Sequence, residues 1–198
     1  MYLYQELLGR FVDNDPVRVG LIGAGKFGSM FLSQAPTSKG LHVTIIADIN
    51  LDSAKQRCRE VGWSAERIGA TRFMDDALAM IEEAAIDVVV EATGNPMIGV
   101  VHANAAIEAG LHIVMVNVEA DVLTGALLAR KAEAAGVVYT MAYGDQPALT
   151  CELVEWARAC GFDVVAAGKG TKYLPSYRAS TPETVWGHYG LTQEQAAK

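Results

Sequence analysis

The fold is decided by one stretch of the sequence, VRVGLIGAGKFG at residues 17–28. Its first six residues form an apolar run typical of a buried β-strand, and its last six have the spacing GxGxxG. This spacing is informative here because it follows a predicted strand and opens a predicted helix at residues 27–35. A second apolar run ends at Asp48, about 20 residues after the last glycine. The order of strand, glycine loop, helix, strand and acid predicts a dinucleotide-binding βαβ unit.

The residues of the glycine loop have separate physical tasks. Gly23 permits a tight turn, Gly25 lets the backbone approach a pyrophosphate, and Gly28 lets the helix pack closely on the strand. The helix N-terminus, which includes Lys26 and Phe27, offers free N–H groups and a positive dipole end to phosphates. We predict that these five residues bind the cofactor. The alternative is a glycine-rich turn without a ligand.

Asp48 is placed to read the ribose of the cofactor. Its carboxylate would accept hydrogen bonds from the adenosine ribose hydroxyls and would repel a 2′-phosphate, which favours NAD over NADP. Asn50, Lys55 or Arg57 could still meet a phosphate, so the cofactor is predicted as NAD or NADP. The structural alternative is that Asp48 caps the helix that starts near Leu51.

Short apolar runs alternate with helix-forming stretches through most of the chain. The predicted strands lie at 17–22, 42–47, 86–91, 112–117, 137–142 and 163–167, and the predicted helices at 27–35, 51–61, 75–84, 97–109, 121–135 and 147–160. Because the strands are apolar throughout, helices must cover both faces of the sheet. The predicted fold class is α/β, a Rossmann-type doubly wound parallel sheet.

Two segments fall outside this alternation. Residues 1–14 have apolar side chains near helical spacing and are predicted to form an amphipathic N-terminal helix that packs on the domain. From Gly168 the chain becomes rich in Gly, Thr, Ser, Pro and Tyr and is predicted to be an irregular C-terminal extension. The expected domains are an N-terminal helix at 1–15, an NAD(P)-binding Rossmann domain at 16–167 and, at 168–198, the truncated start of a substrate or dimerisation region.

Polar residues follow two further predicted strands, at the sheet edge where ligands bind. Thr93, Gly94 and Asn95 are predicted to lie beside the nicotinamide half of the cofactor, or to form only a Gly-Asn-Pro helix start. Asn117 is expected beside the nicotinamide as well.

Several acids and lysines are candidates for chemistry at this edge. Glu119 and Asp121 could bind a metal or a substrate hydroxyl or transfer protons, or Asp121 could be an N-cap and Glu119 a first-turn acid. Asp145 could be catalytic or could cap the helix that begins at Pro147. Lys169 and Lys172 could polarise a carbonyl or pass a proton, although a surface position is the commoner fate of a lysine.

The remaining cysteine, histidine and tryptophan residues indicate packing rather than chemistry. The three cysteines, Cys58, Cys151 and Cys160, have no CxxC spacing and are predicted to be small buried residues. The four histidines have no HxxH or HExxH spacing, so no zinc site is predicted. Leu153 and Trp156 stand at helical spacing and are expected in the core.

Length, charge and hydropathy exclude several classes of protein. The chain has 198 residues, 51% of them hydrophobic, which is enough for a substantial core and atypical of disorder. With 16 basic against 23 acidic residues it does not suit nucleic acid, and no apolar run approaches the ~20 residues that span a bilayer. The N-terminal segment lacks the pattern of a secretion signal. We expect a cytoplasmic protein with a small-molecule substrate and neither a nucleic-acid nor a membrane partner.

Four segments together resemble a family. VGLIGAGKFGSMFLSQ, VVVEATGNP, HIVMVNVEADVLTG and AYGDQPALTCELVEWARACGFDVVAAGKGTKY are similar to homoserine-dehydrogenase-like oxidoreductases that carry a C-terminal SAF domain, a group that includes deoxyxylulose-phosphate-reductoisomerase-like enzymes. The resemblance covers residues 17–189. It implies an NAD(P)-binding domain, with substrate and dimer contacts from a following region, and therefore a homo-oligomer in the full-length protein.

One position departs from these families. Homoserine dehydrogenases and reductoisomerases generally have Asn-Lys where this chain has Asn117 followed by Val118 and Glu119. A lysine by the substrate would then have to come from Lys169 or Lys172.

The function predicted from the sequence is an NAD(P)-dependent oxidoreductase of the homoserine-dehydrogenase-like type. It would transfer hydride to or from a small polar hydroxy or oxo compound. One alternative is a sugar-phosphate reductoisomerase in which Glu119 and Asp121 hold a divalent metal. A second alternative is a non-catalytic module that senses the dinucleotide.

Overall fold

The computed structural model describes residues 3–82, 85–143 and 146–168, together with residues 179, 181, 184 and 192. The chain divides into two compact units, Met1–Leu149 and Thr150–Lys198. Three predicted catalytic residues, Asp145, Lys169 and Lys172, lie outside the described residues.

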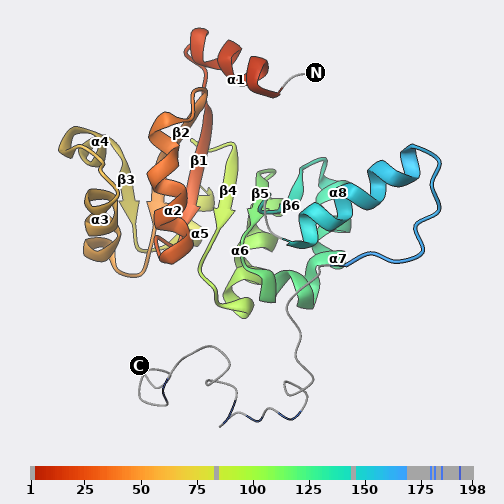
Figure 1. Ribbon diagram of the computed structural model, residues 1–198. Coiled ribbons are helices and arrows are strands. Elements are labelled where there is room, and N and C mark those ends of the chain that lie inside the picture. The colour runs from red at the N-terminus through yellow and green to blue at the C-terminus, as the bar shows by residue number, and fades with distance from the viewer. Residues whose placement is uncertain are drawn as a thin grey trace. The chain divides into compact units, whose positions relative to one another are not determined.

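The first unit is built on a parallel sheet (Figure 1). Its strands are β1 (Val17–Ile22), β2 (Leu41–Ala47), β3 (Arg72–Met74), β4 (Val88–Glu91), β5 (His112–Met115) and β6 (Tyr139–Met141). They lie in the order β3-β2-β1-β4-β5-β6, and every neighbouring pair is parallel. The strand order reverses between β1 and β4, which is where such sheets bind ligands. The predicted Rossmann-type doubly wound sheet is confirmed.

Helices connect the strands and precede the first one. They are α1 (Leu3–Val12), α2 (Lys26–Gln34), the short 3-10 helix η1 (Ala35–Thr37), α3 (Leu51–Glu60), α4 (Ala65–Ala70), α5 (Ala77–Glu82), α6 (Pro96–Glu108), α7 (Val118–Ala135) and α8 (Gln146–Ala159). None of the helices in the described part of the chain is long and apolar enough to cross a membrane.

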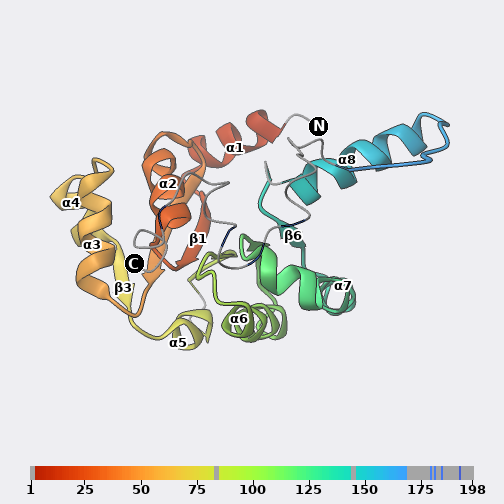
Figure 2. The same cartoon turned by 60° about the horizontal axis from the view of Figure 1, so that its bottom comes forward.

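The core lies in two layers, one on each face of the sheet. Leu21 packs in a cluster with side chains of α2 and α3, whereas the next residue, Ile22, packs in a cluster with α5, α6 and α7. Ile45 and Ile46 divide between the two clusters in the same way. Figure 2 shows α2 on one side of the sheet and α5 and α6 on the other. Because successive strand residues point to opposite faces, burial on both faces requires the continuous apolar runs.

The N-terminal helix is confirmed, but its packing is limited. Within α1 no residue is fully buried, and Leu3 and Val12 are 75% and 78% exposed. Its contacts lie near Gly40, where a Cβ would overlap the carbonyl oxygen of Leu7 and where φ is +77°. The ammonium of a neighbouring lysine, Lys39, lies 5.7 Å from the ring centre of Phe11.

Three elements differ from the sequence prediction. The sequence missed β3 and α4, because elements of three and six residues are too short to show a period. The strand predicted at 163–167 is wrong: residues 162–168 form neither strand nor helix, and Val165 is 96% exposed. No described strand pairs with this run, so its apolar residues have no sheet face to cover.

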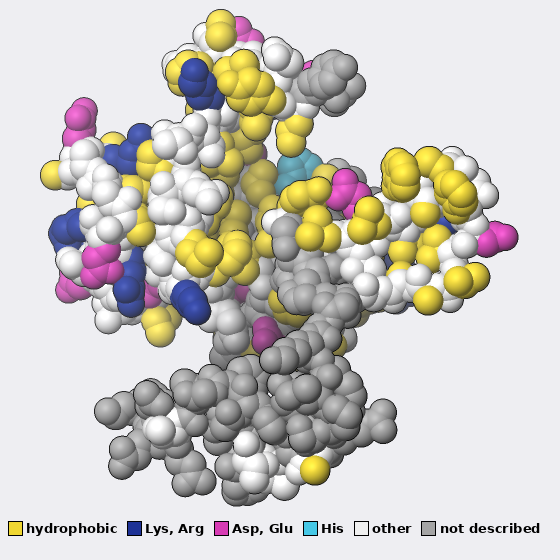
Figure 3. All heavy atoms as spheres, viewed as in Figure 1, with side chains coloured by type: hydrophobic (Ala, Val, Ile, Leu, Met, Phe, Trp, Pro, Cys, Tyr) yellow, Lys and Arg dark blue, Asp and Glu magenta, His cyan; other side chains and the backbone are white. Residues whose placement is uncertain are grey.

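The second unit contains most of α8, whose apolar side chains are poorly covered. Hydrophobic side chains are exposed on α8 among charged ones (Figure 3). Leu153 and Trp156 are 65% and 63% exposed, so the prediction that they lie in the core is wrong. Cys151 and Cys160 are exposed as well, contrary to prediction. Cys58, in α3, is buried as predicted, and loss of hydration raises the pKa of its thiol to about 11.

One ion pair fastens β1 to the turn that precedes β4. The Asp87 carboxylate accepts hydrogen bonds from the backbone N–H of Arg18 at 2.8 Å, from its Nε at 3.0 Å and from its Nη2 at 2.6 Å. The hydrogen bonds from Arg18 hold the pKa of Asp87 below its ordinary value of 3.8. The pair therefore ties together the two strands between which the strand order reverses.

We predict that Asp87→Asn lowers the melting temperature in a pH-dependent manner. Because the pKa of Asp87 is lower in the folded than in the unfolded chain, its contribution is fully present above pH 4 and is lost as the pH falls through the folded value. Melting curves from pH 7 to pH 3 should show the difference from wild type shrinking below about pH 4. Glu60→Gln, in the exposed pair with Arg57, is the control and should change little. A difference that grows toward acid would contradict the prediction.

Candidate dinucleotide-binding site

The strand register aligns the carboxyl ends of the central strands. Ala47 pairs with Ile22, Ile22 with Glu91, and Glu91 with Met115. The segments that follow these four residues therefore leave the sheet along one edge. They contain Asp48, the glycine loop at residues 23–28, the turn at residues 93–95, and Asn117.

The glycine loop combines two crowded positions with one open position. Gly23 has φ +91°, and a Cβ there would lie 2.8 Å from the carbonyl oxygen of Ala92. A Cβ at Gly28 would overlap the carbonyl oxygen of Gly23. A Cβ at Gly25 would meet nothing within 4 Å. The packing of the protein itself thus excludes side chains at Gly23 and Gly28, whereas the open position at Gly25 fits the approach of a ligand such as a pyrophosphate.

The helix that follows the loop begins without a side-chain cap. Gly25 is the N-cap of α2, and within the described part of the chain no side-chain cap accepts a hydrogen bond from the first N–H groups of this helix. By contrast, Asn50, Asn95 and Asn117 cap α3, α6 and α7 through their side-chain oxygens. Lys26 and Phe27 lie exposed in the first turn of α2. The N–H groups of this turn are left for an anion at the positive end of the helix dipole.

Asp48 is fixed beside the glycine loop by two backbone hydrogen bonds. Its Oδ2 accepts from the N–H of Ala24 at 2.8 Å, and its Oδ1 accepts from the N–H of Asn50 at 2.9 Å. The alternative that Asp48 caps the next helix is wrong, because Asn50 is the N-cap and accepts from the N–H of Ser53 at 2.9 Å. Each carboxylate oxygen of Asp48 retains a lone pair, so the two oxygens could still accept hydrogen bonds from ribose hydroxyls.

The 93–95 turn is exposed at the same edge. The side chain of Asn95 accepts from the N–H groups of Met97 and Ile98 at 3.1 and 3.2 Å, so this amide caps α6. Gly94 has φ +71°, and a Cβ there would meet nothing within 4 Å. Thr93 donates its hydroxyl to Glu91. The backbone at Gly94 is therefore open to a ligand, whereas the side-chain oxygen of Asn95 is occupied by the hydrogen bonds that cap α6.

Asn117 joins the 93–95 turn to α7. It is 2% exposed; its Nδ2 donates to the carbonyl oxygen of Asn95 at 2.8 Å, and its Oδ1 accepts from the N–H of Ala120 at 3.2 Å. Both ends of the amide are thus engaged within the protein.

The two acids after Asn117 face different surroundings. Glu119 is exposed in the first turn of α7. Asp121 accepts a hydrogen bond of 2.7 Å from the hydroxyl of Tyr139, and burial, followed by this contact, raises the pKa of Tyr139. A Cβ at Gly125 would overlap the Asp121 carboxylate. The alternative that Asp121 is the N-cap is wrong, since the helix begins three residues earlier.

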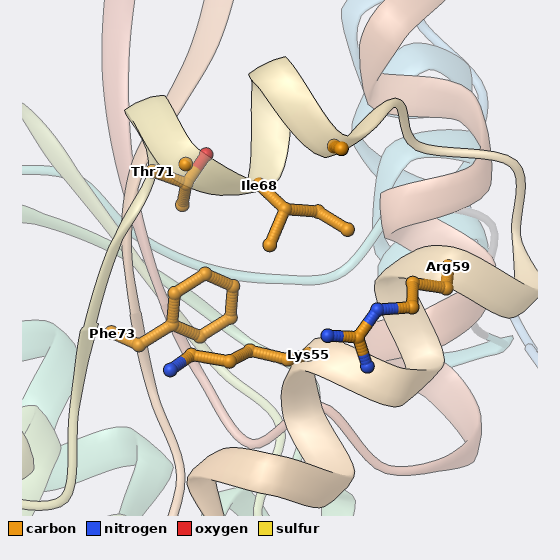
Figure 4. A pocket seen from close by; sticks show the side chains of 7 residues that line it. Lys55, Arg59, Ile68, Thr71 and Phe73 are labelled. Carbon is orange, nitrogen blue, oxygen red and sulfur yellow. The ribbon is translucent and has the colours of Figure 1, made fainter.

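The described residues form no group of three or more His, Cys, Asp or Glu side chains that could hold a metal ion. A cavity of about 420 Å³ lies elsewhere among them (Figure 4). It is lined by Lys55, Arg59, Ala65, Ile68, Gly69, Thr71 and Phe73, from α3, α4 and β3. Lys55 is one of the residues that the sequence offered as a contact for a 2′-phosphate. Its ammonium lies 5.5 Å from the ring centre of Phe73 and is thus directed into that cavity.

Sequence reasoning missed Glu91 and His102 as members of the site. Glu91 is fully buried, and its Oε1 accepts from the hydroxyl of Thr93 at 2.6 Å. His102 in α6 places its Nδ1 3.3 Å from the same oxygen. The signal was a carboxylate at the end of the otherwise apolar strand VVVE, where a buried acid is rare.

The parallel sheet, the glycine loop and the acid after β2 define the Rossmann class of dinucleotide-binding folds. The chain belongs to the GFO/IDH/MocA oxidoreductase family with an NAD-binding Rossmann fold, whose pattern matches residues 17–117. Residues 144–198 match a second pattern, the catalytic domain of oxidoreductase DRL. No curated protein matches the chain.

Solved structures share the fold at low sequence identity. An NAD binding oxidoreductase from Klebsiella pneumoniae is 22% identical with a TM-score of 0.55, over 74% of this chain and 39% of its own. Biliverdin reductase from Synechocystis, solved with biliverdin and NADP+, is 22% identical with a TM-score of 0.54, over 73% and 42%. A homoserine dehydrogenase from Thiobacillus denitrificans is 24% identical with a TM-score of 0.53, over 64% and 29%. This chain therefore corresponds to less than half the length of each.

We predict that substitutions at two glycines of the loop differ in their effect on stability. Gly28→Ala forces a Cβ into the carbonyl of Gly23 and should reduce the free energy of unfolding by about 1–3 kcal/mol. Gly25→Ala, the matched control, enters open space and should change it by less than about 0.5 kcal/mol. Urea unfolding followed by circular dichroism measures both; equal stability of the two variants would contradict the crowding at Gly28.

Proposed function

We propose that the carboxyl edge between β1 and β4 binds NAD and that this sheet is the cofactor-binding part of an NAD-dependent oxidoreductase. The observation that carries the proposal is the open position at Gly25 above the uncapped start of α2, with Asp48 fixed beside it. Crowding at Gly23 and Gly28 shapes the loop, while the N–H groups of α2 hold the pyrophosphate. The bound cofactor supplies or accepts the hydride, and this chain orients it.

Asp48 favours NAD over NADP. Two backbone N–H groups hold its carboxylate, so the negative charge cannot swing away from a 2′-phosphate. The ribose hydroxyls of NAD, in contrast, would donate to the remaining lone pairs. Lys55 could have offset this charge, but its ammonium is directed over Phe73.

The substrate is proposed to be a small polar hydroxy or oxo compound, as the homoserine-dehydrogenase-like resemblance implies. Glu119, exposed at the start of α7, is the acid best placed to meet a substrate at this edge. The match of residues 144–198 to a catalytic domain supports substrate contacts from that segment, which includes Asp145, Lys169 and Lys172.

The alternatives have less support. For the metal alternative, the hydroxyl of Tyr139 already engages Asp121 Oδ1, and the described residues form no group of three or more His, Cys, Asp or Glu side chains that could hold an ion. A non-catalytic sensing module would bind the dinucleotide equally well and differ only in the absence of turnover.

We predict that NADH binds at least about tenfold more tightly than NADPH, which is ~1.4 kcal/mol. Asp48→Asn removes the charge and should narrow this preference, because the 2′-phosphate is no longer repelled. Titration of each cofactor, followed by its fluorescence, measures the two dissociation constants. Binding of neither cofactor at millimolar concentration would overturn the proposed function.

We also predict that Gly25→Ala weakens NADH binding by about tenfold while the protein melts like the wild type. A methyl group at this position occupies the space that the pyrophosphate needs. A tenfold loss of affinity corresponds to ~1.4 kcal/mol of binding free energy. Calorimetric titration and a melting curve of the same sample separate binding from folding. Glu60→Gln, on α3 and away from the loop, should leave NADH binding unchanged. Unaltered affinity in Gly25→Ala would argue against this location of the pyrophosphate.

A further inference from the structure

Glu91 is a buried acid that the proposed function does not yet use. It ends β4, its side chain is fully buried, and its Oε2 has no hydrogen-bond partner among the described residues. A valine at this position would continue the apolar strand without burying an unpaired polar atom. A buried polar atom without a hydrogen bond lowers stability, so such an atom in a native protein calls for an explanation. Here the explanation lies in the contacts of the other carboxylate oxygen, Oε1.

Glu91 Oε1 holds the 93–95 turn. It accepts from the hydroxyl of Thr93 at 2.6 Å and from its N–H at 3.3 Å, and the Nδ1 of His102 lies 3.3 Å away. The Thr93 hydroxyl oxygen in turn accepts from the N–H of Asn95 at 3.3 Å. The carboxylate thus fixes the conformation of a turn whose residues are themselves exposed.

The same network reaches the next turn of the edge. The backbone carbonyl of Asn95 accepts a hydrogen bond from Asn117 Nδ2 at 2.8 Å. The N–H of Val116 donates to the backbone carbonyl of Glu91 at 2.9 Å. A Cβ at Gly99, inside α6, would lie 2.6 Å from Asn117 Nδ2 and 3.1 Å from Glu91 Oε2. Glycine is unfavourable inside a helix, but here it leaves room for the two polar side chains.

The network lies on the β4 side of the glycine loop. A Cβ at Gly23 would lie 2.8 Å from the carbonyl oxygen of Ala92 and 3.1 Å from the N–H nitrogen of Thr93. Asp48 lies on the opposite side, after β2. A dinucleotide with its adenosine ribose at Asp48 therefore extends its nicotinamide half over the 93–95 turn.

We propose that Glu91 is a positioning residue, which through Thr93 holds the 93–95 turn in the form that receives the nicotinamide half of the cofactor. The inference rests on the proposed function. It predicts that loss of the Glu91 contacts weakens recognition of the nicotinamide riboside and spares recognition of adenosine and pyrophosphate.

The test compares NADH with ADP, which has the adenosine and pyrophosphate but lacks the nicotinamide riboside. Calorimetry measures both ligands on the wild type, Glu91→Gln and Thr93→Val. Thr44→Val is the matched control, since its hydroxyl bonds the carbonyl of Val19 away from the edge. Both site variants should bind NADH about tenfold more weakly and ADP within about twofold of wild type, and the control should change neither.

Each other outcome overturns a stated part. If the wild type binds NADH and both site variants bind it equally well, Glu91 has no positioning role. If the site variants lose NADH and ADP affinity to the same extent, Glu91 and Thr93 support the whole fold and the inference is again wrong. Failure of the wild type to bind NADH overturns the proposed function itself. If Glu91→Gln does not fold, as judged by circular dichroism, Thr93→Val decides, because it removes only the exposed partner of the carboxylate.

Discussion

The structure depends on the close approach of three backbone segments at the start of α2. Gly28 packs against the carbonyl of Gly23, and Gly23 packs against Ala92 after β4. These contacts set how closely α2 and β4 approach β1, and so they shape the edge of the sheet at the point where the strand order reverses. Gly25 stands between the crowded positions, and a Cβ there would meet nothing within 4 Å, which leaves the backbone open to a ligand at that point.

Burial of both sheet faces explains why the polar groups gather at one edge. Strand residues such as Leu21 and Ile22 supply opposite core layers, so the sheet has no solvated face for polar chemistry. The carboxyl ends remain, where Asp48, the 93–95 turn and Glu119 follow β2, β4 and β5. Hydrogen bonds among the turns, especially those of Glu91 and Asn117, then join the separate segments into one surface.

Much of the fold could be predicted because its signals are local. The alternation of apolar runs and helices located five of the six strands, and the glycine spacing located the loop. Elements as short as β3 and α4 have too few residues for a period to appear. The run at 163–167 has strand-like composition, but composition cannot supply a neighbouring strand, and the described segment remains irregular. The prediction that Trp156 lies in the core is wrong for the same reason, because helical spacing does not provide a second element that covers the side chain.

The sequence by itself determined the dinucleotide-binding fold class and the identity of the loops at its edge, because strand periodicity and glycine spacing are properties of neighbouring residues. Only the tertiary structure decided what each polar side chain does. Asn50, and not Asp48, caps α3; Asp121 turns to Tyr139; and Glu91 joins Thr93 and His102 below the 93–95 turn. These partners come from different elements, and hydrogen bonds require distances near 3 Å that sequence spacing does not specify.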